Sequence, residues 1–425
     1  SGAGTSRFLW DAGTDAISWR RRSAGRRIEL VLWRATADAG AAWSGAAGPL
    51  ETESRAVSRG GRAVFGVPLA AGWIRWGAGF ERHDVGYATP DDDPGTGSTT
   101  GASEISLFGE WHRIFADRLG VTGGLRSSLD GDAEPELEPR LSLSWMPSPR
   151  AQVGIGYSRS RQIVHSLRNE ESVLDVAVPT DFLGRVDGDG GPRAKADQVN
   201  LSLRMRVSPG AEVRAGAYAR RMSGLVLVAP LTAEPLAVSG FARGSGRAVG
   251  LQGSASLTGG DWQGYAAYHL GHSTRTADGA AYRPLFHRTH WGLVGVSRRV
   301  SRHLTMRART RVGSGTPSSP VSPGFSWEAS DPVLGEGDLA GIPLRVGDGL
   351  NETTLPPYAR VDLGVRGAWA LSVLERAGEI AAFVTVENLF GRRNLLTYRL
   401  DPEVGALRPV ALRPLGLNAG VGIAF

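Results

Sequence analysis

The stretch VNLSLRMRV at residues 199–207 decides the fold class of this protein. Hydrophobic side chains occupy every odd position and polar side chains every even one, which is the strict period of two that a β-strand with one apolar and one polar face requires. The same alternation recurs at 141–145, 249–257, 304–311, 360–366 and 415–425. The sequence therefore predicts an all-β protein.

Reading outward from these segments, we predict about 17 strands, with boundary errors of a few residues. They are expected near residues 14–21, 26–36, 53–67, 71–87, 101–115, 118–129, 136–146, 150–162, 195–207, 210–222, 244–258, 260–275, 288–300, 302–313, 357–369, 378–390 and 413–425. Residues 7–11 could add one more strand.

The connectors between these strands alternate in length. Short turns are expected at 147–149, 208–210, 259–260 and 301, and long loops near 88–100, 163–194, 223–243, 276–287, 314–356 and 391–412. Short turns on one rim and long loops on the other are typical of an outer-membrane barrel. We therefore predict a transmembrane antiparallel up-and-down β-barrel that forms one domain over residues 1–425. Neither a soluble sandwich nor a propeller explains this alternation as well.

Composition agrees with this prediction. Gly is 59 of the 425 residues, which disfavours helix bundles, and 12 Trp, 12 Phe and 8 Tyr disfavour disorder. No run of 18 apolar residues occurs, so we expect no membrane-spanning helix. Cysteine is absent. The basic residues that give the net charge of +6 are spread along the chain, so we expect no nucleic-acid partner.

Several short motifs follow one another along the chain in a recognisable order. They are PRLSLSW at 139–145, GYSRSRQ at 156–162, GSGTP at 313–317, LPPYARVDL at 355–363 and VTVENLF at 384–390, followed by the terminal Phe425. Together they resemble the strands of TonB-dependent receptors: LPPYARVDL is similar to the opening of a late barrel strand, VTVENLF to the penultimate strand, and Phe425 to the signal that the barrel assembly machinery recognises. The resemblance implies energy-coupled import of a scarce nutrient such as a ferric siderophore, cobalamin, haem or an oligosaccharide.

The resemblance also implies partners and a location. These are outer-membrane lipid and lipopolysaccharide, a TonB-type energising protein, and a small-molecule or metal-chelate ligand, in a bacterial outer membrane with the C-terminus periplasmic. The family's barrel has 22 strands around an N-terminal plug. No plug is seen in this sequence, and we expect the chain to be part of a longer protein.

The polar stripes predict a positive barrel lumen. Their arginines are Arg204, Arg206, Arg214, Arg307, Arg309, Arg311, Arg360 and Arg366. In a complete receptor we expect many of them to pair with plug carboxylates, because unpaired charges in a confined lumen are costly. The same stripes leave an alternative open, a plugless passive porin with an anion-preferring lumen. A third reading is an adhesin whose long loops bind another protein.

Aromatic and polar residues of the long loops are the candidate ligand contacts, because loops carry function and aromatic rings supply binding area. They are Tyr282, His287, Phe325, Trp327, Glu328, Asn351 and Tyr398. No nucleophile elbow or nucleotide-binding glycine loop occurs, so we expect no enzyme, no catalytic residues and no cofactor. His269 and His272 would point to opposite faces of a strand, and we expect no metal site.

Overall fold

The computed structural model describes most of the chain. The described residues are 7–45, 48–88, 98–130, 135–166, 183–184, 193–228, 241–277, 279–319, 322–327, 341–346, 350–373, 376–401 and 406–424. Over these residues the regular structure is β-strand. No helix in this part of the chain is long and apolar enough to cross a membrane.

An 18-stranded sheet holds all the long strands and the short β15 (Ala280–Tyr282). The long strands are β1 (Arg7–Ser23), β2 (Arg26–Gly45), β3 (Gly48–Leu69), β4 (Gly72–Ala88), β5 (Ser98–Phe115), β6 (Leu119–Asp130), β7 (Glu136–Ser148), β8 (Ala151–Gln162), β11 (Ala194–Ser208), β12 (Ala211–Val228), β13 (Phe241–Gly259), β14 (Trp262–Ala277), β16 (His290–Arg299), β17 (Leu304–Gly313), β22 (Tyr358–Val373), β23 (Arg376–Glu387) and β26 (Gly416–Ala424). Each coincides with one of the 17 predicted segments, so the predicted strand order is confirmed.

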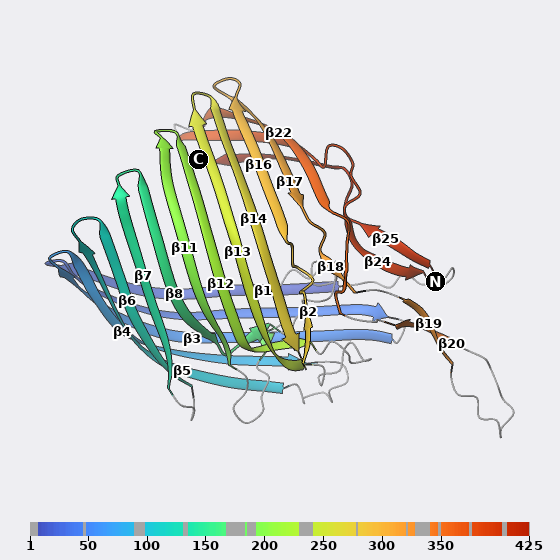
Figure 1. Ribbon diagram of the computed structural model, residues 1–425, viewed down its shortest axis with the longest axis horizontal. Coiled ribbons are helices and arrows are strands. Elements are labelled where there is room, and N and C mark those ends of the chain that lie inside the picture. Colours follow the sequence, from blue (N-terminus) through green and yellow to red (C-terminus); the bar gives the residue numbers. More distant parts are fainter. Residues whose placement is uncertain are drawn as a thin grey trace. The chain divides into compact units, whose positions relative to one another are not determined.

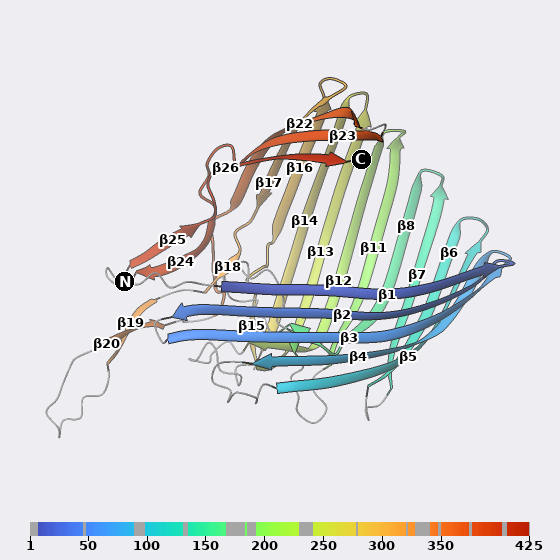
Figure 2. The same ribbon diagram turned by 180° about the vertical axis from the view of Figure 1, so that it is seen from behind.

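Two compact units make up the chain. Unit 1 comprises Ser1–Leu203, Tyr218–Ala248 and Thr276–Ala280, and unit 2 the remaining residues. In unit 1, strands β1 to β8 each pair antiparallel with the next along the chain. In unit 2 the ladder runs β14, β16, β17, β22, β23 and β26, again antiparallel. Neighbouring strands such as β3, β4 and β5 lie side by side in both views (Figure 1 and Figure 2).

Most short turns and long connectors lie where they are predicted, but the first three connectors, between β1 and β4, are each only two residues long. Two-residue turns join β1 to β2 and β3 to β4, and Ala24 and Gly25 in the first of these turns have φ of 48° and 76°. Short hairpins also lie within the longer connectors, formed by β9 (His165–Ser166) with β10 (Leu183–Gly184), β18 (Pro317–Ser318) with β21 (Thr353–Thr354), β19 (Ser322–Trp327) with β20 (Gly341–Val346), and β24 (Leu395–Asp401) with β25 (Ala406–Ala411).

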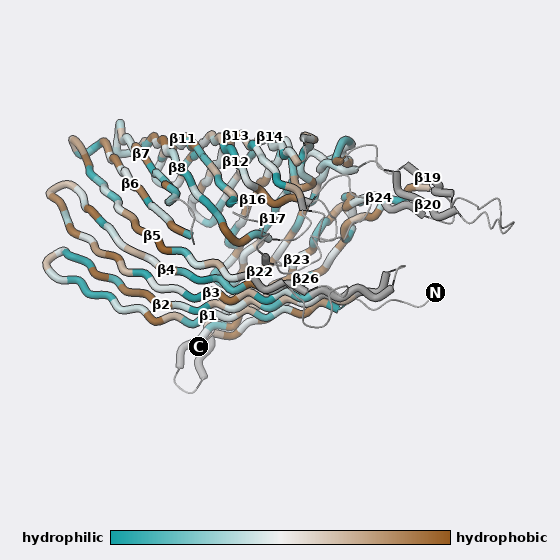
Figure 3. Tube along the Cα trace, turned by 90° about the horizontal axis from the view of Figure 1, so that it is seen from below, coloured by the Kyte–Doolittle hydropathy of each residue, from teal (hydrophilic) through white to brown (hydrophobic). Residues whose placement is uncertain are grey.

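Register separates an apolar from a polar face. In unit 1 the row Ile17, Leu32, Gly61, Phe80 and Ile105 crosses β1 to β5 on one face, and its large side chains are exposed. Charged side chains such as Arg62, Glu81 and Glu104 occupy adjacent positions and therefore lie on the other face. The alternation is visible along each strand in Figure 3 as changing hydropathy. Because a lone apolar face in water is unfavourable, this arrangement needs an apolar environment on one side.

Glycine makes room for aromatic rings on the neighbouring strand. A methyl group on Gly60 would overlap the ring of Trp33, the residue directly opposite it on β2. The same relationship joins Gly77 to Phe108, where the added carbon would lie 2.7 Å from the ring. Such aromatic coverage of strand glycines stabilises curved sheets. It accounts physically for part of the high glycine content.

The structure extends the predicted strands at the start of β1, where β2 and β3 meet, and at the end of β12. Residues 7–11 do not form an additional strand, because they begin β1 and pair with β2 as far as Ala42. Strands β2 and β3 continue to Gly45 and Gly48, which are register partners, well beyond the predicted ends at 36 and 53. Likewise β12 runs to Val228, inside the loop predicted at 223–243.

Candidate functional site: the polar face

Three neighbouring rows of side chains form the polar face of unit 1. One row contains Glu29, Val64, Gly77, Phe108, Arg126 and Glu138. The rows on either side run from Val31 through Arg62, Gly79 and Ser106 to Ser128, and from Arg27 through Arg75 and Glu110 to Arg140. Together they line a hollow of about 560 Å³. Glycines, acidic side chains and basic side chains all line this hollow.

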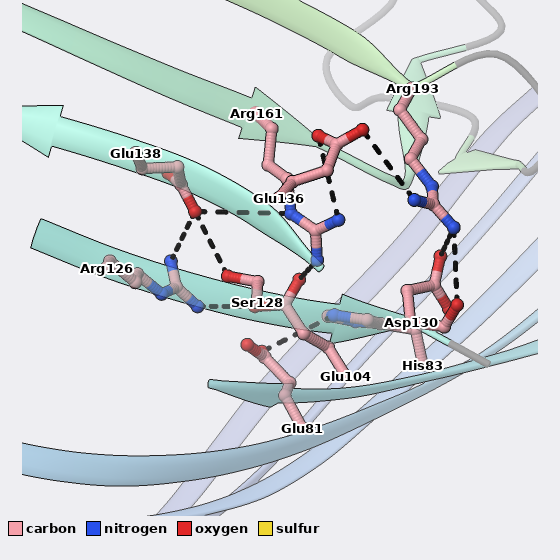
Figure 4. A network of polar contacts seen from close by, with 10 residues as sticks. All are labelled: Glu81, His83, Glu104, Arg126, Ser128, Asp130, Glu136, Glu138, Arg161 and Arg193. Atoms are coloured by element: carbon pink, nitrogen blue, oxygen red, sulfur yellow. Dashed lines mark hydrogen bonds and ion pairs between the residues drawn. The ribbon is translucent and has the colours of Figure 1, made fainter. Parts of the chain in front are cut away.

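A connected set of ion pairs occupies one side of this face (Figure 4). The side chain of Arg161 is only 3% exposed, and its Nη2 donates to Glu104 at 2.6 Å. Its Nε lies 4.0 Å from Glu138. Arg126 also contacts both carboxylates, and Ser128 donates to Glu138 at 3.1 Å. Two arginines thus share two carboxylates, which offsets the cost of burying Arg161.

The network continues along β7 and β11. Glu136 lies 2.8 Å from Lys195 and 3.7 Å from Arg193, and Arg193 also lies 3.6 Å from Asp130. Arg193 follows Asp130 by 63 residues, so these contacts fix the start of β11 to the adjoining ends of β6 and β7. The residues at this strand end are therefore held by charge as well as by backbone hydrogen bonds.

Unit 2 contains a second set of ion pairs. It is built around Asp362, whose side chain is 3% exposed. Its carboxylate accepts hydrogen bonds from Arg309 at 3.2 Å, Arg360 at 2.5 Å and the backbone N–H of Asn388 at 3.0 Å. Glu387 pairs with Arg360 at 3.1 Å. The motif strands β22 and β23 are thereby joined to β17 through one buried carboxylate.

The eight arginines expected in the lumen fall into two groups. Arg309 is the register partner of Asp362, and Arg307 is the register partner of Gly364. Five have carboxylate partners: Arg204 and Arg214 share Glu212, Arg309 and Arg360 share Asp362, and Arg366 pairs with Glu379. Within the described residues, Arg206, Arg307 and Arg311 make no ion pair. Five of these eight arginines, all of them in unit 2, are therefore balanced by the protein's own acids, which the sequence pattern did not predict.

Three of the predicted ligand contacts are buried. Tyr282 and His287 are 7% and 5% exposed, and Asn351 is 2% exposed with its backbone N–H bonded to Ser319 at 3.2 Å. Tyr398 on β24 is half-buried. Phe325 and Trp327 lie on β19, with only their backbone described, and Glu328 and Phe425 lie outside the described residues. Their roles in ligand binding and assembly stay predictions.

His287 packs into a small polar cluster between β15 and β16. Its Nδ1 lies 3.0 Å from the Ser273 hydroxyl, and its ring meets that of His272 edge to face at 5.4 Å. Burial lowers the pKa of His287, and the neighbouring charges of His272 and Arg283 lower it further. His290 lies apart from this cluster, with its Nδ1 2.6 Å from the Tyr268 hydroxyl.

Arg288 is a residue that the sequence reasoning missed. Its guanidinium lies 5.3 Å from the ring centres of both Trp291 and Tyr358, and it donates to the Ser314 carbonyl at 2.8 Å. Burial lowers its pKa. Across the described part of the chain, no group of three or more His, Cys, Asp or Glu residues could hold a metal ion.

Comparison with known proteins identifies this architecture. No protein-family model matches the sequence, and no curated protein matches it. Among solved structures, the chain is similar to the copper transporter OprC, with 14% identity over 98% of this chain and 65% of OprC at a TM-score of 0.65. It is similar to the ferric yersiniabactin uptake receptor FyuA from Yersinia pestis, with 14% identity over 98% of this chain and 61% of FyuA, at 0.61.

The ferric citrate transporter FecA gives the same result, with 13% identity over 99% of this chain and 62% of FecA at a TM-score of 0.62. The chain therefore spans less than two thirds of the length of each of these three proteins. All three are TonB-dependent receptors, which are outer-membrane barrels. Since the predicted strand order, the antiparallel pairing and the comparison agree, the chain has the transmembrane β-barrel fold of the TonB-dependent receptors.

Proposed function

We propose that this chain is the barrel portion of an outer-membrane transporter that imports a scarce small molecule or metal chelate with energy from a TonB-type protein. The observation that carries the proposal is that 98–99% of the chain matches the barrels of a copper transporter, a ferric yersiniabactin uptake receptor and a ferric citrate transporter. A ferric siderophore is the ligand class that we favour. Cobalamin, haem and oligosaccharides are the other candidates.

The proposal includes a location and a path. The apolar face would contact outer-membrane lipid and the polar face would line the lumen, with one domain over residues 1–425 and the C-terminus in the periplasm. Ligand would first meet the long loops that contain Tyr282, His287, Phe325, Trp327, Glu328, Asn351 and Tyr398. Phe425 would serve the barrel assembly machinery.

Charge pairing favours this reading over a passive porin. An anion-selective pore needs guanidinium groups free to meet ions. Arg309 and Arg360 instead share the buried Asp362, and Arg204 and Arg214 share Glu212. That the chain is not an enzyme remains a prediction, supported by neighbours named as transporters and receptors.

Uptake in whole cells tests the proposal. Iron-starved cells with and without the gene would be given ⁵⁵Fe-labelled siderophore from their own culture medium, with and without a protonophore that collapses the proton gradient. We expect gene-dependent uptake that the protonophore abolishes. Gene-dependent uptake that survives the protonophore would instead indicate a passive pore, and parallel assays with ⁶⁴Cu and labelled cobalamin would identify another ligand class.

A further inference from the structure

Three arginines stand side by side on the apolar face of unit 1. Arg34 on β2 is the register partner of Arg59 on β3, which is in turn the partner of Arg82 on β4. All three side chains are exposed. Directly opposed residues of antiparallel strands have Cβ atoms about 5 Å apart, and like charges at such positions are destabilising. A row of three positive charges on an otherwise apolar face therefore needs an explanation.

The protein supplies only part of the balancing charge. Arg82 donates to Asp84 at 2.9 Å. Asp15 is the register partner of Arg34, but no ion pair joins them within 4.0 Å in the described structure. In that same part of the chain, Arg34 and Arg59 make no ion pair or side-chain hydrogen bond. Two guanidinium groups with five N–H donors each thus remain available on this surface.

The row lies at the border of the apolar band. The adjacent row toward the short turns contains Ile17, Leu32 and Phe80, with Leu32 63% and Phe80 48% exposed. The next row in the same direction contains Trp19 and Leu30. On the other side of the arginines, the next row contains Thr36, Val57 and Asp84, and the row beyond it contains Asp38 and Arg55. Arg34, Arg59 and Arg82 therefore mark one edge of the surface that would contact hydrocarbon.

The height of the band agrees with a membrane. At about 3.3 Å per residue, Arg82 lies about 33 Å along β4 from Gly72 at the short turn. A strand tilt of about 40° reduces this to about 25 Å along the barrel axis, which is the usual height of the apolar band. Near the other edge, Trp76 stacks on Phe65 with ring centres 6.1 Å apart, as expected of an interfacial aromatic girdle.

We propose that Arg34, Arg59 and Arg82 form a binding site for the phosphate groups of lipopolysaccharide in the outer leaflet. This inference rests on the proposed function only for the membrane placement of the barrel. A guanidinium matches a phosphate with two parallel hydrogen bonds. A soluble anion would gain no binding energy from the adjoining apolar side chains of Leu32 and Phe80. A lipid would, because it presents a phosphate to the arginines and acyl chains to the apolar side chains.

The geometry of the row favours a glycolipid over a phospholipid. Two inter-strand spacings separate Arg34 from Arg82, about 10 Å in all. A phospholipid such as phosphatidylglycerol offers one phosphate, but the disaccharide of lipid A carries two and spans several strands. The long-loop end of the strands is also the end that the proposed topology places at the cell exterior, where lipopolysaccharide is found.

Lipid titration of the purified protein tests the site. Detergent-solubilised full-length protein would be titrated with diphosphoryl lipid A, dephosphorylated lipid A, phosphatidylglycerol and inorganic phosphate, with native mass spectrometry as the readout. We expect diphosphoryl lipid A to bind at least about ten-fold more tightly than the other three. The double variant Arg34→Gln/Arg59→Gln should lose at least about ten-fold in that affinity.

The matched control is Arg62→Gln/Arg140→Gln. These two arginines are also exposed and make no ion pair among the described residues, but they lie on the polar face of the same unit. The control should bind diphosphoryl lipid A as the unmodified protein does. Circular dichroism and heat-dependent mobility on a gel would confirm that both variants are folded.

Three outcomes would overturn the site. They are equal binding of dephosphorylated lipid A, equal binding of phosphatidylglycerol, and an unaffected Arg34→Gln/Arg59→Gln variant. Failure here is distinguishable from failure of the proposed function. A protein that fractionates with the outer membrane and supports energy-dependent uptake, yet shows no phosphate preference, would refute this site alone.

Discussion

The carboxylate of Asp362 on β22 accepts a hydrogen bond from the backbone N–H of Asn388, 26 residues later, at 3.0 Å. Asn388 has φ of 54°, so the chain turns sharply as it leaves β23. The same carboxylate receives Arg309 and Arg360. The motif at 355–363 and the motif at 384–390 therefore meet at one buried acid, and the arginine and aspartate of the first motif bond to each other.

Removing this acid should be costly. In Asp362→Ala, Arg309 and Arg360 lose their shared partner and the Asn388 N–H loses its acceptor, and we expect a loss of about 1–3 kcal/mol in the free energy of unfolding. Urea unfolding in detergent micelles, followed by tryptophan fluorescence, measures it. As a control, Arg366→Gln breaks an ion pair whose side chains are 45% and 54% exposed, and it should cost about 1 kcal/mol or less. Equal effects of the two variants would refute the central role of Asp362.

Gly60 should tolerate no side chain while Trp33 lies over it. We expect Gly60→Ala to cost about 1–3 kcal/mol in urea unfolding, because the new methyl group overlaps the Trp33 ring and approaches the Phe80 carbonyl at 2.8 Å. Gly109→Ala on β5 is the matched control, since a methyl group there meets nothing within 4 Å. In the double variant Gly60→Ala/Trp33→Leu, the smaller side chain should recover part of the loss. A Gly60→Ala variant as stable as Gly109→Ala would contradict this account.

The period-two pattern was sufficient to predict the strands because side-chain alternation is a local property of the sequence. It failed at the ends of β2 and β3, where residues such as Ala39, Gly40 and Ala41 carry too little hydropathy contrast to show a period. The arginine stripes were predicted, but not their neutralisation. Pairing Arg309 with Asp362 requires the register of β17 against β22, and register depends on contacts that are distant in sequence.

Loop residues were the least predictable part of the candidate site. Aromatic and polar types in a long connector suggest ligand contact, yet Tyr282 and Asn351 are almost fully enclosed by the protein. Composition cannot distinguish a loop side chain that packs inward from one that faces solvent. Likewise, Arg288 gave no signal in the sequence, because its position between Trp291 and Tyr358 depends on how β16 and β22 are placed.

The pairing of Arg161 with Glu104 should be strongly coupled. In a double-mutant cycle of Arg161→Leu and Glu104→Gln, we expect a coupling energy of about 1–3 kcal/mol, because the guanidinium is buried and donates at 2.6 Å. The comparison cycle uses Arg55 and Asp38, which lie 3.5 Å apart and are 71% and 45% exposed. That exposed pair should show about 0–1 kcal/mol. Additive effects at Arg161 and Glu104 would mean that Arg126 alone satisfies the carboxylate.

Acidification should loosen the segment around His287. The folded protein holds the pKa of His287 below the value of about 6.5 expected for an unfolded chain, first through burial and then through His272 and Arg283. Between the two pKa values the unfolded segment binds more protons than the folded one, so stability rises with pH there. His287 therefore contributes its full stability above about pH 6.5, and that contribution is lost as the pH falls, by up to about 1.4 kcal/mol per pH unit.

Amide hydrogen exchange of residues 283–289 in detergent micelles, between about pH 7.5 and pH 5.5, measures this effect once intrinsic exchange rates are corrected for. We expect protection to fall on acidification in the unmodified protein and to change much less in His287→Gln, whose amide cannot be protonated. His112→Gln on β5 removes a histidine that bonds to Thr122 at 2.9 Å, and it should leave the response of residues 283–289 intact. An unchanged pH response in His287→Gln would assign the effect to another group, His272 first, because its ring lies against that of His287.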